Sequence, residues 1–448
     1  MVKVITYGTY DLFHYGHQRL LERAKALGDY LIVGVTSDSF DLTRGKINAQ
    51  QSLMERIESV RATGLADEII VEEYEGQKID DIKRYGVDIF TVGSDWKGKF
   101  DYLNEFCKVV YLDRTEGVSS SEIRAEKRVL KIGIVGNSSL INKFEKESQY
   151  VNGVTISGIC TTDDSDLFDE IKKKYLITDN YDRLLELSDA VYVVSHPQKH
   201  YKHVKRALQA GKHVLCESPI TLCTIELDEL LELAKEKNLQ LMDSIKTAYS
   251  TAYNRMLVLA KGGKIGDIIS VDSICTSLSD LEIKTKRGTS LNEVWNSICA
   301  WGPTAMLPIF QLLGKEYVNK QITSHLIADH FDTFSKITFV YPQAVASIKV
   351  GKGVKSEGEL IISGTKGYIY VPAPWWKTDY FEIKYENPVD NKRYFYQLDG
   401  EGIRYELVSF LKAIQKGRKD FSYIDEFVSQ AFVGIIEDFY NHKDLVTI

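Results

Sequence analysis

The sequence predicts an α/β chain of three successive domains. Short β-branched apolar runs alternate with helix-period stretches through residues 1–128, which is typical of βα units and a parallel sheet. The same alternation starts again over residues 129–245, and near Lys246 it gives way to a strand-rich pattern that continues over residues 246–448. A length of 448 residues is also too great for one core of ordinary size. We therefore expect two parallel-sheet domains and a third domain richer in strands.

The elements of the first domain follow from this alternation. Strands are expected at Val2–Tyr7, Tyr30–Thr36, Glu68–Val71, Ile89–Val92 and Lys108–Leu112. Helices are expected at Gln18–Ala26, Ser52–Ala62, Ile79–Tyr85 and Ser121–Lys127. The first of these helices precedes Gly28, which is expected to cap its C-terminus.

The later elements are read in the same way. Val129–Gly136 is a strand that runs into a glycine, and the charged stretch before it predicts a helix that couples the domains stiffly. In the third domain, residues 337–341 and 359–363 alternate as strands do. Two helical segments, Gly402–Ile414 and Tyr423–Phe439, are expected to pack back on this third domain.

Composition excludes several classes of protein. Hydrophobic residues make up 44% and charged residues 27%, as in ordinary soluble globular proteins. The net charge of −7 offers no general attraction to nucleic acid or anionic lipid, and no run of about 18 apolar residues suggests a membrane span. The six cysteines are scattered without a CxxC pair, which indicates reduced thiols and a cytoplasmic location rather than disulfides or a zinc site.

One cluster of residues after the first strand indicates anion binding. His14 and His17 lie three apart with Gly16 between them, at the expected start of a helix. Backbone N–H groups at a helix N-terminus bind anions, glycine permits close approach, and imidazoles donate hydrogen bonds to phosphoryl oxygens. A zinc pair, which would need further ligands, and surface histidines are the alternatives. We favour a phosphate site and expect no metal bound by the protein itself.

These residues resemble a known family. The segment from Tyr7 to His17 is similar to the HxGH signature of the nucleotidyltransferase superfamily, and Val109–Gly117 is similar to the glycerol-3-phosphate cytidylyltransferase family. The resemblance covers essentially all of residues 1–128 and implies a Rossmann-like parallel sheet. It further implies that CTP and a small alditol phosphate, glycerol 3-phosphate first, react with Mg²⁺ assistance to give a CDP-alditol and pyrophosphate. A homodimer that supplies precursors for capsule or teichoic-type surface polymers is also implied.

The resemblance assigns roles residue by residue. His14, His17, Lys46 and Arg114 are the expected catalytic residues, which hold and neutralise the phosphates. The expected nucleotide-binding residues are Gly8, Thr9, Asp11, Phe13, Gly16, Asp67, Gly93, Asp95, Trp96, Thr115, Ser119 and Ser120. Alternatives stay open: both serines can be a plain N-cap, Trp96 a packed aromatic, and Asp11 and Asp67 turn or solvated residues.

Two departures from the family pattern concern the acceptor. Thr63–Glu68 lacks the arginine and aromatic that the family often has before this turn. The loop around Lys46 is one residue longer than expected, so Arg44 can share the role of Lys46.

The later chain resembles the Gfo/Idh/MocA oxidoreductases, above all at Ser195–Val204 and Ala207–Pro219. This resemblance implies a Rossmann domain followed by an α/β domain with an open antiparallel sheet. The implied nicotinamide-binding residues, for NAD or NADP, are Gly136, Ser195, His196 and Glu217.

Several positions in this second resemblance depart from the family. After Gly136 the GxGxxG fingerprint is lost, Thr161 stands where an acid usually holds the ribose, and Ser218 replaces the catalytic lysine. The DxGxH pattern falls on Ala300–Thr304, which has neither the aspartate nor the histidine. A non-catalytic scaffold or sensor is therefore favoured over a working reductase that would make the polyol phosphate. Replacement proton donors for such a reductase would be Lys199, His200 or Lys246.

Overall fold

The computed structural model describes residues 1–37, 49, 51, 53–74, 76–113, 129–278, 294–396, 398, 400–416 and 422–448. The chain divides into two compact units, Met1–Val129 and Leu130–Ile448.

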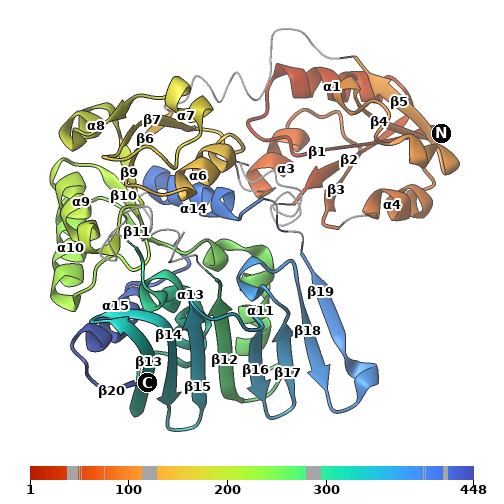
Figure 1. Ribbon diagram of the computed structural model, residues 1–448. Helices are drawn as coiled ribbons and strands as arrows, with labels where there is room; N and C mark the ends of the chain where they lie inside the picture. The colour runs from red at the N-terminus through yellow and green to blue at the C-terminus, as the bar shows by residue number, and fades with distance from the viewer. Residues whose placement is uncertain are drawn as a thin grey trace. The chain divides into compact units, whose positions relative to one another are not determined.

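The first unit is built on a five-stranded parallel sheet (Figure 1). Its strands are β1 (Lys3–Gly8), β2 (Tyr30–Thr36), β3 (Glu68–Glu72), β4 (Ile89–Gly93) and β5 (Lys108–Leu112). They lie in the order β3-β2-β1-β4-β5, so the chain reverses its direction of growth between β1 and β4. Open α/β sheets bind their ligands at such a point, beyond the carboxyl ends of the strands.

Helices cover both faces of this sheet. They are α1 (Tyr15–Lys25), α3 (Leu53–Arg61) and α4 (Gln77–Tyr85), with short 3₁₀ turns η1 (Ser94–Trp96) and η2 (Asp101–Glu105) after β4. Successive residues of β1 enter opposite cores, because side chains alternate along a strand: Val4 packs with Leu21 and Val60, and Ile5 with Ile82 and Phe90. All five predicted strands are present, within about one residue at each end.

The first helix corrects one prediction. It begins at Tyr15 rather than Gln18, and its C-terminal cap is Ala26 in the right-handed conformation, so the prediction that Gly28 is the cap is wrong. A Cβ at Gly28 would lie 2.6 Å from the carbonyl oxygen of Val2 and 2.7 Å from a methyl of Val4. Gly28 is therefore required for close packing of the chain against β1. The predicted helix Ser121–Lys127 lies outside the described residues.

The second unit begins with a six-stranded parallel sheet. Its strands are β6 (Leu130–Val135), β7 (Val154–Cys160), β8 (Ile177–Thr178), β9 (Ala190–Val193), β10 (His213–Glu217) and β11 (Leu241–Ser244). The flanking helices are α6 (Leu140–Ser148), α7 (Asp169–Lys174), α8 (Tyr181–Leu187), α9 (Pro197–Gln209) and α10 (Thr224–Glu236). The order β11-β10-β9-β6-β7-β8 places the switch point between β6 and β9.

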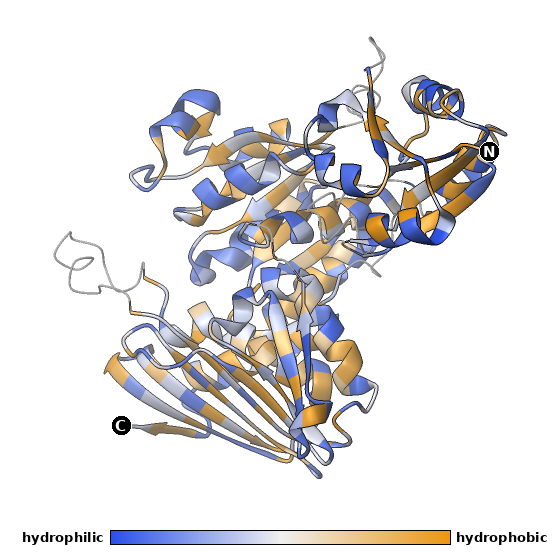
Figure 2. Ribbon diagram, turned by 90° about the vertical axis from the view of Figure 1, so that its right-hand side faces the viewer, coloured by the Kyte–Doolittle hydropathy of each residue, from blue (hydrophilic) through white to orange (hydrophobic). Residues whose placement is uncertain are grey.

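A nine-stranded mixed sheet follows. Its strands are β12 (Ile268–Thr276), β13 (Asn319–Ala328), β14 (Phe331–Val340), β15 (Val345–Gly351), β16 (Leu360–Gly364), β17 (Gly367–Val371), β18 (Tyr380–Tyr385), β19 (Lys392–Phe395) and β20 (Leu445–Thr447). All neighbours are antiparallel except β12 with β15 and β13 with β20. Apolar and polar residues alternate along these strands (Figure 2), because only one face carries the helices.

The helices of this part are α11 (Thr251–Lys261), α13 (Ser297–Leu313), α14 (Ile403–Lys416) and α15 (Glu426–Tyr440), with 3₁₀ turns η3 (Lys246–Tyr249), η5 (Trp375–Lys377) and η6 (Pro388–Asp390). The two predicted C-terminal helices correspond to α14 and α15. They pack on residues 246–448, as predicted, through η3 and α13, and they also pack on α6 and α10. They therefore join the six-stranded and nine-stranded layers into one unit.

Candidate active site

The loop between β1 and α1 forms the centre of the site in the first unit. Tyr10 and Leu12 adopt left-handed backbone conformations, with φ of 53° and 49°. Non-glycine residues rarely adopt this conformation unless the surroundings enforce it. The Arg56 guanidinium, completely buried, supplies part of that enforcement by donating to the carbonyl oxygens of Thr9 and Thr36, each at 2.7 Å. Arg56 is not predictable from the sequence, because an arginine in an amphipathic helix has no distinguishing local pattern.

Asp11 holds the same loop from its other side. Its carboxylate accepts the backbone N–H of Gln51 at 3.0 Å, and the Gln51 side chain accepts the N–H of Leu12 at 2.7 Å. Asp11 is buried, so its contacts in this structure position the loop.

The two signature histidines lie together at the N-terminus of α1. Nδ1 of His14, the N-cap residue, accepts the backbone N–H of Gly16 at 3.0 Å. The neutral imidazole of His14 therefore carries its proton on Nε2, which makes that atom a donor. The rings of His14 and His17 stack with centroids 4.0 Å apart, and Phe13 packs against His17 at 5.6 Å. Two imidazoles are thus presented side by side at the carboxyl edge of the sheet.

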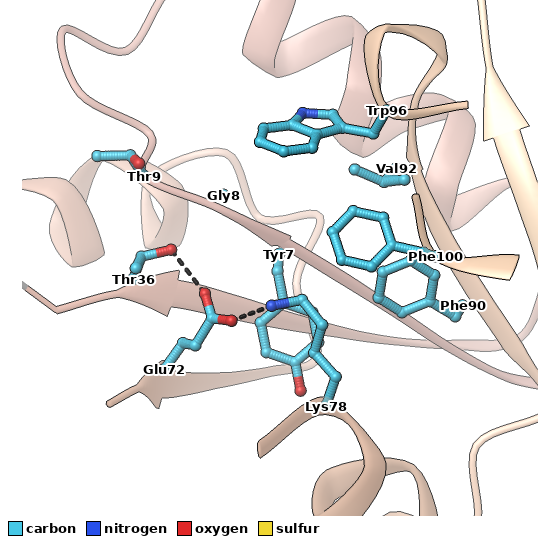
Figure 3. Close-up of a pocket in the computed structure, with 10 residues that line it drawn as sticks. All are labelled: Tyr7, Gly8, Thr9, Thr36, Glu72, Lys78, Phe90, Val92, Trp96 and Phe100. Atoms are coloured by element: carbon cyan, nitrogen blue, oxygen red, sulfur yellow. Dashed lines mark hydrogen bonds and ion pairs between the residues drawn. The ribbon is translucent and has the colours of Figure 1, made fainter. Parts of the chain in front are cut away.

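A pocket joins this loop to the segment after β4 (Figure 3). Gly8 and Thr9 line it from the first segment and Trp96 from the second, so three residues predicted for nucleotide binding share one cavity. Trp96 is half-buried, and its ring packs on Phe100 with centroids 5.8 Å apart. Gly93 ends β4, and Asp95 is exposed on η1 next to Trp96.

The pocket has a charged floor. Glu72, at the end of β3, forms an ion pair with Lys78 of α4 and accepts the hydroxyl of Thr36 at 2.8 Å. The ammonium of Lys78 lies 4.6 Å from the Tyr7 ring centroid. Because Glu72 and Lys78 are both buried, this pair is a fixed polar feature in a mostly aromatic wall. Neither residue was predicted for the site.

Some predicted residues lie elsewhere. Asp67 precedes β3, at the amino-terminal edge of the sheet, where it accepts the N–H of Leu31 at 2.6 Å and pairs with Lys25. The structure therefore does not bring Asp67 to the histidines. Lys46, Arg114, Thr115, Ser119, Ser120 and Arg44 lie outside the described residues.

In the second unit, the four residues predicted for nicotinamide binding share the carboxyl edge of the six-stranded sheet. Gly136 follows β6, Ser195 and His196 follow β9, and Glu217 ends β10. A Cβ at Gly136, where φ is 140°, would lie 2.4 Å from the backbone nitrogen of Ser195. This glycine therefore brings the two strand ends into contact at the switch point.

The phosphate-binding turn of this edge fits a dinucleotide only in part. Ser138 takes the position of a fingerprint glycine, and its hydroxyl accepts the N–H of Leu140 at 3.2 Å. Thr161, where an acid usually binds ribose, instead donates to the Asn137 side chain at 2.5 Å. The fold and the carboxyl edge of the sheet fit a nicotinamide dinucleotide. The hydroxyls of Ser138 and Thr161, in contrast, form hydrogen bonds within the protein.

The candidate proton donors have different surroundings. His200 is completely buried, and its ring nitrogens lie 2.8 Å and 2.7 Å from the carbonyl oxygens of Pro219 and Ser195. Burial lowers the pKa of His200 to about 4, so this ring joins backbone segments rather than serving substrate. Lys199 is exposed on α9, and Lys246 pairs with Glu401 at 3.1 Å. Glu217 accepts hydrogen bonds from Tyr192 and Ser244.

Three further observations concern metals, thiols and membranes. Asp329, His330 and His442 have ligand atoms within 4.8 Å of one another, on the surface of the nine-stranded layer. All six cysteines are free thiols. Among the described helices, none has the length and apolarity needed to cross a membrane.

Comparison with known proteins agrees with this division. The family described as cytidylyltransferase-like matches residues 5–126, and the NAD-binding Rossmann fold of the Gfo/Idh/MocA oxidoreductase family matches residues 130–244. Glycerol-3-phosphate cytidylyltransferase of Bacillus spizizenii is 52% identical over 126 residues, which are 28% of this chain and 97% of that protein. The Staphylococcus aureus enzyme of the same name is 47% identical over 130 residues, 28% of this chain and 95% of that protein.

A solved structure resembles the second unit. The 3-ketoreductase KijD10 from Actinomadura kijaniata, in complex with NADP and TDP-benzene, aligns with a TM-score of 0.62 at 16% identity, covering 71% of this chain and 99% of that one. At this identity the likeness shows the fold alone. The histidine pair at the switch point and the near-complete coverage of the curated relatives lead to one conclusion: through its first unit, the chain belongs to the glycerol-3-phosphate cytidylyltransferase family of nucleotidyltransferases, and a Gfo/Idh/MocA-type oxidoreductase fold follows it.

Proposed function

We propose that the first unit condenses CTP with glycerol 3-phosphate to give CDP-glycerol and pyrophosphate. An oxygen of the acceptor phosphate attacks the α-phosphorus of CTP, and the bond to the β-phosphate breaks, so that pyrophosphate leaves. The observation that carries this proposal is the paired His14 and His17 at the N-terminus of α1, beside a pocket at the switch point. Such a reaction needs alignment and charge neutralisation more than a protein nucleophile.

Each group has a role in this proposal. Nε2–H of His14 donates to a phosphoryl oxygen of CTP, and the adjacent His17 ring holds a second phosphate. Lys46 and Arg114 are proposed to neutralise the leaving and attacking phosphates, and Mg²⁺ is proposed to arrive with the triphosphate. Thr9, Gly93, Asp95 and Trp96 are proposed to surround the nucleotide.

The floor of the pocket suits a small hydroxylated acceptor. Lys78 offers an ammonium for the acceptor phosphate, and Glu72 and Thr36 offer oxygens for hydroxyl groups. The aromatic walls from Phe90 and Phe100 limit the size of the acceptor. We therefore place glycerol 3-phosphate ahead of longer alditol phosphates and ethanolamine phosphate.

Pyrophosphate release tests this assignment. CTP is supplied with glycerol 3-phosphate, ethanolamine phosphate or longer alditol phosphates, without nicotinamide. Lys78→Met is expected to raise KM for the acceptor at least about tenfold while KM for CTP changes little, as loss of a charge-assisted contact predicts. Lys83→Met is the matched control, because Lys83 is an exposed residue of the same helix. Equal effects of the two variants would remove Lys78 from the acceptor site.

We also propose NAD(P) binding by the second unit. The observation that favours it is the convergence of Gly136, Ser195, His196 and Glu217 at the β6/β9 switch point. A bound nicotinamide would supply hydride chemistry, and a reductase acting there would make the polyol phosphate that the first unit consumes. Titration of NADH and NADPH into the full chain should give saturable fluorescence enhancement. A linear response up to millimolar cofactor contradicts this second proposal.

The setting of the enzyme is part of the proposal. We propose a cytoplasmic homodimer whose product feeds capsule or teichoic-type polymers. Light scattering on the purified chain measures the oligomeric state, and a monomer would contradict that part.

A further inference from the structure

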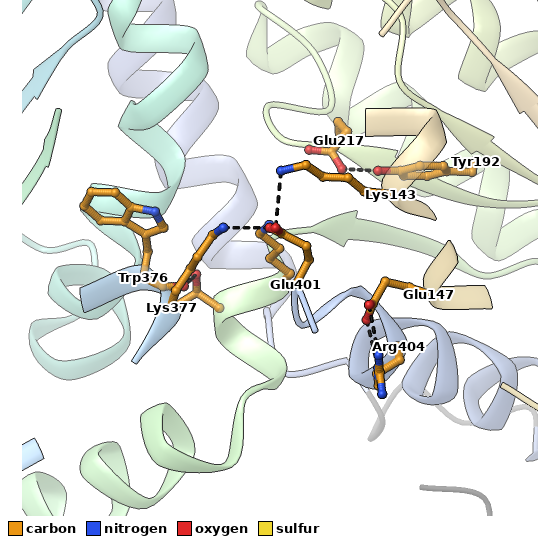
Figure 4. A network of polar contacts seen from close by, with 10 residues as sticks. Lys143, Glu147, Tyr192, Glu217, Trp376, Lys377, Glu401 and Arg404 are labelled. Atoms are coloured by element: carbon orange, nitrogen blue, oxygen red, sulfur yellow. Dashed lines mark hydrogen bonds and ion pairs between the residues drawn. The ribbon is translucent and has the colours of Figure 1, made fainter. Parts of the chain in front are cut away.

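Three lysines of the second unit converge on one carboxylate. Glu401 lies 2.7 Å from the ammonium of Lys377, 3.1 Å from that of Lys246 and 3.4 Å from that of Lys143. Figure 4 shows Lys143 and Lys377 reaching Glu401 from different elements. Lys143 is on α6, Lys246 begins η3 and Lys377 ends η5, so this lysine cluster is assembled by the tertiary fold.

The lysine cluster carries more positive than negative charge. Three ammonium groups face one carboxylate, which leaves two charges unbalanced. Partial burial by itself would raise the pKa of Glu401, but the contacts with Lys377 and Lys246 lower it to about 2, so the carboxylate stays ionised. Buried Glu217 and Glu406 also face Lys246, and burial raises the pKa of each, which disfavours their charged forms.

The cluster differs from an ion pair that only stabilises the fold. Such a pair is present nearby, where Arg404 of α14 contacts both carboxylate oxygens of Glu147 and the two side chains are 10% and 3% exposed. The three lysines instead keep 48%, 25% and 37% exposure, and all three pair with Glu401. Their charges are therefore accessible to a ligand from solvent.

The cluster lies where such a ligand is expected. Lys246 follows β11, whose last residue, Ser244, is the register partner of Glu217 at the end of β10. Ligands of open α/β sheets bind beyond these carboxyl ends. Trp376, next to Lys377 in the sequence, packs on Trp301 with ring centroids 4.9 Å apart.

The segment that carries Glu401 has an unusual backbone conformation. Glycines on both sides, Gly400 and Gly402, have φ of 62° and 85°, a conformation that other residues adopt only at a cost. This backbone turns Glu401 into the lysines at the start of α14.

We infer that the lysine cluster binds the phosphate group of a small phosphate monoester, and that Glu401 occupies the anion position until the ligand displaces it. A phosphate monoester carries close to two negative charges at neutral pH, which matches the surplus. Lysines bind phosphate as point charges and need no fixed fork geometry. The inference concerns only residues of the second unit and does not depend on cytidylyl transfer.

Calorimetric titration of the full chain with inorganic phosphate, and separately with glycerol 3-phosphate, tests the inference. Glu401→Gln removes the competing charge and should tighten phosphate binding about fivefold or more, whereas Lys246→Met and Lys377→Met should each weaken it by about the same factor. Lys384→Met is the matched control, since Lys384 also pairs with a glutamate, Glu382, at 3.0 Å and has similar exposure. It should leave phosphate binding within about twofold of wild type.

The comparison also separates this site from the first unit. Phosphate bound near His14 is common to all these variants, so only the difference between them reports on the lysine cluster. Circular dichroism melting checks that each variant is folded, and Glu401→Gln keeps the test decisive if a lysine variant is not. Unchanged or weaker phosphate binding by Glu401→Gln overturns the inference, as does an equal effect of Lys246→Met and Lys384→Met. Loss of cytidylyl transfer alone has no bearing on it.

Discussion

In the proposed reaction His14 has two separable roles, and two substitutions can distinguish them. Its Nδ1 accepts the Gly16 N–H at 3.0 Å and so caps α1, and in the proposed reaction its Nε2–H donates to a phosphate. Asparagine is a good N-cap residue and offers an oxygen to the same N–H, whereas alanine offers none. His14→Asn therefore keeps the cap and removes the donor, and His14→Ala removes both.

The expected magnitudes follow from these contacts. Loss of a preorganised donor to a developing phosphoryl charge costs about 2–4 kcal/mol of transition-state stabilisation, or roughly 30- to 1000-fold in rate. Loss of the cap costs about 1 kcal/mol of folding stability. Both variants should therefore be slow to a similar extent, and only His14→Ala should be measurably less stable.

Pyrophosphate release at saturating CTP and glycerol 3-phosphate gives the rates, and urea unfolding of the same preparations gives the stabilities. A His14→Asn enzyme with a rate near that of wild type would show that His14 acts only as the cap of α1 and donates nothing to the phosphates.

Three other predictions concern stability. Arg56→Met should lower the free energy of unfolding of the first unit by about 3 kcal/mol, because buried carbonyls lose their donor; an unchanged urea midpoint would contradict this. Arg404→Met should destabilise the second unit by about 3–5 kcal/mol, since it leaves Glu147 charged and buried, and calorimetric melting measures the loss. Burial raises the pKa of Asp332 to about 6 from 3.8, so the folded state binds its proton more tightly and stability falls as pH rises between those values. Asp332→Asn should flatten that part of the stability–pH curve, and a curve parallel to that of wild type would show that Asp332 is not the cause.

The sequence was sufficient for the parallel sheets because their signal is local. The bounds of β2 and β5 coincide with the prediction, since apolar β-branched runs define buried strands directly. The start of α1 was placed three residues late, because histidine is not among the usual N-cap residues and its ring nitrogen acts as the cap acceptor here. Gly28 was misread because a glycine that permits close packing and one that caps a helix look alike in sequence.

Residues of the candidate site could be predicted where they belong to one sequence motif. They could not be predicted where only tertiary contacts bring them together. His14, Gly16 and His17 are adjacent in sequence, so their spacing was informative. Arg56 and the Glu72–Lys78 pair act through residues on other elements, which no local period reveals. The lysine cluster joins Lys143, Lys246 and Glu401, which are more than a hundred residues apart in sequence, and only the fold brings them together.

The most direct test of the central claim is product identification. The full chain is incubated with CTP, Mg²⁺ and glycerol 3-phosphate in the absence of any nicotinamide, and the mixture is analysed by mass spectrometry. CDP-glycerol and an equal amount of pyrophosphate are expected, both absent when the acceptor is omitted. If no CDP-alditol forms until NADH or NADPH and a keto-sugar phosphate are supplied, the claim that the first unit acts by itself on a preformed alditol phosphate is contradicted.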